Sequence, residues 1–221
     1  MHAEPRLLLR HVEARGRKLF RRVRDRHYLY SGEQLGLPVG VAMTALALGC
    51  RAMLAVVMFA AVAGKLRRRD FASFVDALRG FGVPAALARV PPRARAGAVV
   101  ALEAAAAALL VVAPAVGLVL SLGLIAMFTV ALRSAVRNGR EVACRCFGAS
   151  TAPVGVAHLV RNGLLLAVIG AGVAATALAA GAEVAPPERL AAIALGVLAG
   201  AAVTRWDDLV YLVAPQPAGR R

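Results

Sequence analysis

Five long apolar runs, separated by short polar joints, restrict what this chain can fold into more than any other feature of its sequence. A helix needs about 20 apolar residues to cross a bilayer. Of the 221 residues, 60% are apolar, against about 45–50% in an average soluble domain. The sequence therefore predicts an all-α, polytopic transmembrane helix bundle with four core helices and a fifth. The predicted spans are residues 38–64, 97–113, 115–132, 153–181 and a shorter 189–204.

Two polar segments flank the predicted transmembrane domain, residues 38–204. Residues 1–34 hold nine Lys and Arg side chains around leucines and valines at helical spacing. This pattern predicts a basic amphipathic helix on the membrane surface, with a solvated extension as the alternative. Residues 205–221 form a polar C-terminal tail. Inside the domain, a turn at 114–117 is so short that the second and third spans must form an antiparallel hairpin.

The chain has a formal net charge of +15. The positions of its basic residues argue against nucleic acid as the partner. Nucleic-acid-binding proteins carry basic faces on a soluble core. Here the basic residues crowd the joints between apolar runs, as in the Lys65, Arg67, Arg68 and Arg69 cluster that ends the first span. This layout indicates a multi-pass membrane protein whose neighbours are anionic lipid headgroups.

Three ionisable residues, Arg51, Glu103 and Arg161, lie within the apolar runs. A charge near the bilayer centre costs about 2.5–3.5 kcal/mol, so each needs a partner or a route to the interface. From the helical rise, Glu103 lies about 9 Å and Arg161 about 12 Å from the same face, whereas Arg51 lies about 20 Å away. We therefore predict a Glu103–Arg161 pair. The alternatives are an Arg161 that extends to the interface and a protonated Glu103 bonded to a neighbouring helix.

The most reactive feature is the CxC pair, Cys144 and Cys146, in the polar loop at 133–151. A disulfide between such close residues closes a tight ring, and strained exposed disulfides are the labile or catalytic ones. Arg145 between the cysteines favours the nucleophilic thiolate. The spacing therefore suits thiol–disulfide exchange, with a pair of inert thiols as the alternative. A metal site would need more ligands than the loop offers.

The chain resembles a known family in several of these segments. The segments are "CRCFG" at 144–148, "HLVRNGLLL" at 158–166, "AGKLRRRDFASFVDALRGFGVP" at 63–84 and "ALE" at 101–103. Together they resemble the methylamine utilisation protein MauE family, which belongs to the DoxX-like four-helix membrane proteins. The resemblance covers about residues 45–181, and "TRWDDLVYLV" at 204–213 is similar to members with an added helix. Arg145 departs from the small residue, often glycine, that the family usually has there.

The resemblance implies a redox-associated protein of the bacterial inner membrane, with the CxC loop on the extracytoplasmic side. Members of the family are linked to maturation of the disulfide-rich light subunit of methylamine dehydrogenase, alongside a thioredoxin-like partner. The resemblance would make Cys144 and Cys146 the exchanging pair, with Glu103, Arg161 and Asn162 as polar residues beneath them. No quinone motif or haem-ligand pair is recognisable, so no cofactor is evident.

Two questions stay open at the level of sequence. The short loops on the CxC side are rich in Lys and Arg, which favours a cytoplasmic CxC, whereas the basic N-terminal segment favours the opposite orientation. The competing function is a non-redox membrane scaffold or a small-solute carrier that uses the intramembrane charges, because buried ionisable residues often mark such pathways.

Overall fold

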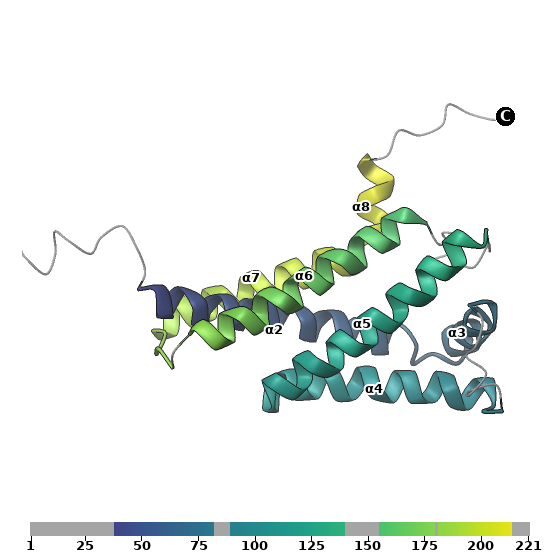
Figure 1. Cartoon of the computed structure of the whole chain (residues 1–221), viewed down its shortest axis with the longest axis horizontal. Coiled ribbons are helices and arrows are strands. Elements are labelled where there is room, and N and C mark those ends of the chain that lie inside the picture. Colours follow the sequence, from purple (N-terminus) through teal and green to yellow (C-terminus); the bar gives the residue numbers. More distant parts are fainter. Residues whose placement is uncertain (1–37, 82–88, 140–154, 180, 214–221) are drawn as a thin grey trace, which may run out of the picture. The chain divides into compact units, whose positions relative to one another are not determined.

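All of the secondary structure in the described part of the chain is helical (Figure 1). The computed structural model describes residues 38–81, 89–139, 155–179 and 181–213, and the predicted N-terminal helix lies outside these ranges. Five of the helices are long and apolar enough to span a membrane, which confirms the predicted all-α transmembrane bundle. The helices are α2 (Val39–Ala63), α3 (Arg68–Gly80), α4 (Pro92–Val112), α5 (Pro114–Arg137), α6 (Val156–Leu178), α7 (Pro186–Thr204) and α8 (Trp206–Val213).

Prolines mark where three of the spans begin, and each of these spans starts earlier than predicted: α4 at Pro92, α5 at Pro114 and α7 at Pro186, three residues before the predicted 189. Proline is favoured at the first position of a helix because its missing N–H would have no intrahelical partner there. Pro92 accordingly starts α4 five residues before the predicted position. The turn predicted at 114–117 is wrong in position, since Pro114 already starts α5 and the break is the single residue Ala113 (φ −141°, ψ 73°).

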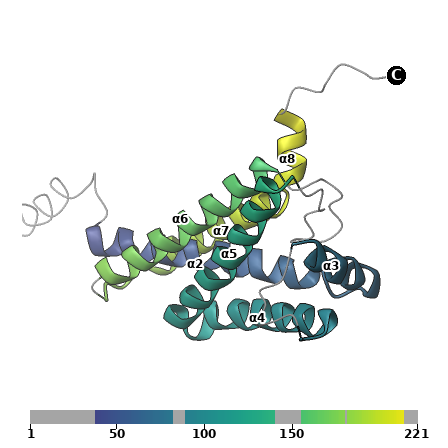
Figure 2. The ribbon, with the colours of Figure 1, turned by 45° about the vertical axis from the view of Figure 1, so that its right-hand side comes forward.

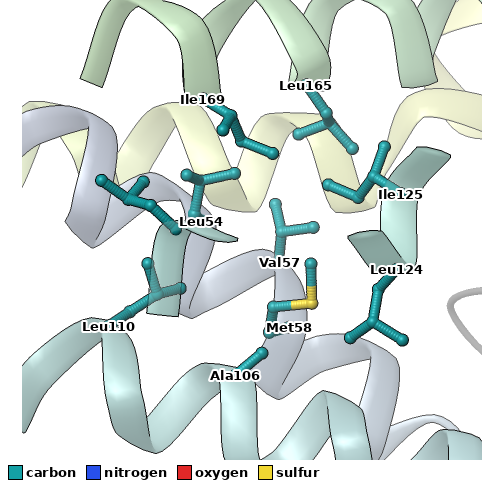
Figure 3. Close-up of a cluster of buried hydrophobic side chains, with 10 residues drawn as sticks. Leu54, Val57, Met58, Ala106, Leu110, Leu124, Ile125, Leu165 and Ile169 are labelled. Atoms are coloured by element: carbon teal, nitrogen blue, oxygen red, sulfur yellow. The ribbon is translucent and has the colours of Figure 1, made fainter. Parts of the chain in front are cut away.

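The helices pack as an antiparallel series around α2 (Figure 1). α4 and α5 form the predicted hairpin, and Gly117 allows its tight contact, because a Cβ there would overlap the backbone of Leu110. α6 returns alongside α5. The apolar core lies between α2, α4, α5 and α6 (Figure 3), and its buried residues are Leu54, Val57, Met58, Ala106, Leu110, Leu118, Leu124, Ile125, Leu165 and Ile169.

α7 packs on α2 through glycines. A Cβ at Gly196 would overlap the carbonyl oxygen of Gly49, and one at Gly200 would lie 2.8 Å from the carbonyl oxygen of Met53. Glycines four residues apart on a helix let two backbones approach closely, which is a common way of packing helices in lipid. Much of the remaining surface of α7 is apolar and exposed, as expected for a helix that faces lipid.

The two short helices lie at the same end of the bundle. α3 packs against α4 (Figure 2). Phe74 and Val75 of α3 are buried with Ala96, in the first half of α4. This confirms the amphipathic pattern of the segment after the first span. α8 occupies the first half of the predicted polar tail. We call this end of the bundle, where α5 finishes and α6 begins, the loop end.

Candidate functional site

A buried ion pair between α2 and α4 forms the centre of the polar cluster at the loop end. The Nζ of Lys65 donates to both carboxylate oxygens of Glu103, at 2.9 Å each. Each residue exposes only 2% of its surface. Two opposite charges at this distance in an apolar interior attract strongly, and this attraction offsets the cost of taking them out of water.

Lys65 also ties the pair to two further groups. Its Nζ donates to the carbonyl oxygen of Ala61, one turn earlier, at 3.0 Å. The same nitrogen lies 4.8 Å from the centre of the Phe74 ring, which is within the range of a cation–π interaction. Lys65 therefore connects α2 and α4 with α3, and its side chain folds back toward its own helix instead of extending outward.

A second polar network connects α6 with α5. The Nε and Nη2 of Arg161 donate to the Oδ1 of Asn162, at 3.4 and 3.2 Å. The Nδ2 of Asn162 donates to the Oγ1 of Thr129, at 3.3 Å, and that hydroxyl donates to the carbonyl oxygen of Ile125. Arg161 and Asn162 are both buried. The network fixes how the first turns of α6 sit against α5.

The two networks meet at one small pocket. Glu103, Arg161 and Asn162 all line it, together with apolar side chains of α2, α4, α5 and α6, and its volume is about 30 Å³. Glu103 and Arg161 therefore lie at one level of the bundle, as predicted, while the CxC loop lies outside the described residues. The predicted ion pair between them is wrong, because the partner of the Glu103 carboxylate is Lys65.

Lys65 is the functional residue that sequence reasoning missed. A basic residue directly after an apolar run is normally an interface anchor whose long side chain extends to the headgroups. One signal was available in the sequence, since Lys65 is the only lysine in a cluster that is otherwise arginine. A lysine can fold back into a narrow interior more readily, because its ammonium is a compact point charge on a flexible stem.

Arg51 reaches neither network. Its Nε donates to the carbonyl oxygen of Leu110 at 3.2 Å, and its Nη2 to that of Val111 at 3.5 Å. The last carbonyls of a helix have no intrahelical partner and carry a partial negative charge. Arg51 therefore caps the end of α4 at the hairpin, far from the loop end.

The cysteine pair that carries the predicted chemistry lies outside the described residues. The same holds for Arg145. The chain leaves α5 through Gly139, whose φ of 61° suits glycine, and it re-enters the described part at Gly155. Cys144 and Cys146 thus belong to the segment that joins the ends of α5 and α6. Cys50, predicted to serve packing, is buried in α2 against Gly172.

His158 stabilises the point where this segment enters α6. Its Nδ1 accepts from the backbone N–H of Gly155 at 3.3 Å. Its Nε2 lies 3.3 Å from Oδ1 of Asp207 in α8, in ion-pair range but without the alignment of a hydrogen bond. Among the described residues, no three His, Cys, Asp or Glu side chains come together as a metal site would require.

Comparison with known proteins identifies a family. The model of the family described as methylamine utilisation protein MauE matches residues 43–177, more than half of the chain. The matched segment contains all of α4 and α5, most of α2 and α6, and every residue of the two polar networks. No curated protein and no solved structure matches the chain. This multi-pass membrane protein belongs to the MauE family.

Proposed function

We propose that this protein takes part in thiol–disulfide exchange during the maturation of an exported protein. The observation that carries the proposal is the family match, because the matched residues 43–177 include both Cys144 and Cys146. The name of the family supports a role in methylamine utilisation. The proposed client is the light subunit of methylamine dehydrogenase, as the resemblance implies. The proposed location is the bacterial inner membrane, with the CxC loop on the extracytoplasmic side.

The chemistry is a pair of exchange steps. A client thiolate attacks one sulfur of the Cys144–Cys146 disulfide, which forms a mixed disulfide and releases the other cysteine as thiolate. A second client thiolate then attacks the mixed disulfide, so the client is oxidised by two electrons and the CxC is reduced. A thioredoxin-like partner in its disulfide form reoxidises the CxC by the same two steps in reverse. Arg145 favours the thiolate that leaves in the first step.

The polar residues beneath the loop support this chemistry by positioning. Arg161 and Asn162 lie within the first two turns of α6, the helix that the CxC segment enters. Glu103 holds α4 to α2 through Lys65 at the same end of the bundle. These contacts hold α6 against α5 and α4 against α2 at the end of the bundle where the segment joins α5 to α6.

The competing function, a carrier that uses the intramembrane charges, has one observation in its favour: the buried Lys65–Glu103 pair. Ionisable groups at such depth often mark a pathway. The pocket beside the pair is only about 30 Å³, whereas sites for organic ligands hold about 300–1,000 Å³. The described pocket is therefore too small to hold an organic solute. A cysteine-free protein that transports a solute, and a Glu103→Gln variant that does not, would favour the carrier.

The test is maturation of the client in cells that produce the protein with Cys144→Ser and Cys146→Ser. We expect the client to accumulate in its reduced form, because the variant has no Cys144–Cys146 disulfide to accept its electrons. The matched control is Cys50→Ser, which removes the third cysteine from the buried face of α2 and should leave maturation unchanged. The readout is the number of alkylated client cysteines by mass spectrometry. Normal client oxidation in the double variant would refute the proposal.

A further inference from the structure

The pocket at the loop end combines an apolar wall with two polar groups that come from different helices. Glu103 belongs to α4 and Asn162 to α6, and both side chains line the pocket while exposing 4% of their surface or less. Met58 and Ala61 of α2 form part of its apolar wall. A polar group buried this deeply normally has all of its hydrogen-bonding capacity used.

The two hydrogen bonds from Lys65 leave acceptor capacity on the Glu103 carboxylate. An ionised carboxylate offers about four acceptor sites, and the Nζ of Lys65 uses one on each oxygen. At least one oxygen of Glu103 can therefore accept a further hydrogen bond from a donor in the pocket.

Asn162 offers the opposite capacity. Its Oδ1 accepts two bonds from Arg161, which identifies the oxygen and fixes the orientation of the amide. Its Nδ2 carries two hydrogens and donates one of them to Thr129. The second hydrogen is available to an acceptor in the pocket.

We propose that the pocket is a binding site for water, which donates to Glu103 and accepts from the second Nδ2–H of Asn162. Water is the ligand class that supplies a donor and an acceptor within this volume. A site needs about 10–15 Å³ and two to four polar partners to hold one water, and the pocket offers about 30 Å³. The water joins the Lys65–Glu103 pair to the Arg161–Asn162–Thr129 network, so that α4 and α6 are hydrogen-bonded to each other through the apolar core.

The experiment is radiolytic hydroxyl-radical labelling of the full-length protein in lipid nanodiscs in ¹⁸O-water, read by mass spectrometry. Radicals form from water at the place where it is bound and oxidise sulfur-containing side chains beside it. Met58 lines the pocket, whereas Cys50, two turns earlier on α2, is equally buried but lies outside it. We expect ¹⁸O to appear on Met58 and Cys50 to stay unlabelled. Labelling of Met58 that is no faster than that of Cys50 would overturn the proposal.

A pocket-filling variant separates bound water from water that reaches Met58 by another route. Ala61→Val places two additional methyl carbons in the pocket wall, and Ala60→Val adds the same volume on a part of α2 that does not line the pocket. Both variants are first shown to unfold at the temperature of the unsubstituted protein. We expect Ala61→Val to abolish Met58 labelling and Ala60→Val to preserve it. Equal labelling in the two variants would contradict a site at this place. This outcome is independent of any redox role of the cysteines.

Discussion

Replacing Lys65 with methionine is expected to lower the free energy of unfolding by about 3–5 kcal/mol, the range measured when one partner of a buried ion pair is removed. Methionine keeps the length and the apolar stem of the lysine. The variant leaves the Glu103 carboxylate in the interior without its two hydrogen bonds. It also removes the cation from the face of the Phe74 ring and so weakens the attachment of α3.

The measurement is equilibrium unfolding in detergent micelles, followed by circular dichroism. Lys65→Met combined with Glu103→Leu should recover much of the lost stability, because replacing both partners of a buried pair with apolar groups is often neutral. Arg79→Met is the matched control, since its pair with Asp76 is exposed and such pairs contribute only about 0–1 kcal/mol. A double variant as unstable as Lys65→Met alone would show that the buried charge is not the cause.

Replacing Gly196 with leucine is expected to detach α7 from α2. The new Cβ would overlap the carbonyl oxygen of Gly49 and approach Ala52 Cβ at 3.0 Å. A flexible side chain can move out of the way, but a helical backbone cannot move without shifting the whole helix. Overpacking typically costs about 1–3 kcal/mol, and we expect the upper part of this range because the obstacle is backbone.

The effect is measured as unfolding free energy, together with the rate at which protease cleaves the joint at 182–185 in detergent. Gly170→Leu in α6 is the matched control, because a Cβ at Gly170 meets nothing within 4 Å. We expect faster cleavage in Gly196→Leu and an unchanged rate in Gly170→Leu. Equal behaviour of the two variants would mean that the close approach of α2 and α7 does not hold α7 in place.

The spans could be predicted from sequence because contact with lipid requires long stretches of apolar residues. A helix that crosses the bilayer needs about 20 predominantly apolar residues, so α5 and, despite Arg51, α2 are recognisable as long apolar runs. Their ends are less visible. Pro92 and Pro114 interrupt the apolar pattern and suggest a turn, yet each lies inside the first turn of a helix. A proline usually ends a helix that comes before it, but it is well accommodated in the first turn of a helix that begins there.

The sequence predicts how far the candidate-site residues lie from the loop end, but it does not predict which of them contact each other. The rise of 1.5 Å per residue gives how far Glu103 and Arg161 lie from the loop end, and both line one pocket. Which residues face each other also depends on how each helix is rotated about its axis and on where long side chains turn. Lys65 turns back into the bundle, and Arg51 reaches the end of α4 instead of an acidic group. Neither direction is encoded in the spacing of residues along one helix.

The central claim is that Cys144 and Cys146 form a disulfide that opens and closes at the outer face of the membrane. It is tested most directly by treating intact cells with a membrane-impermeant thiol reagent, with and without prior reduction, in a Cys50→Ser background. We predict labelling of both cysteines only after reduction, which shows that they are paired and extracytoplasmic. Labelling of both without reduction, or of neither under any condition unless the cells are opened, would contradict the account.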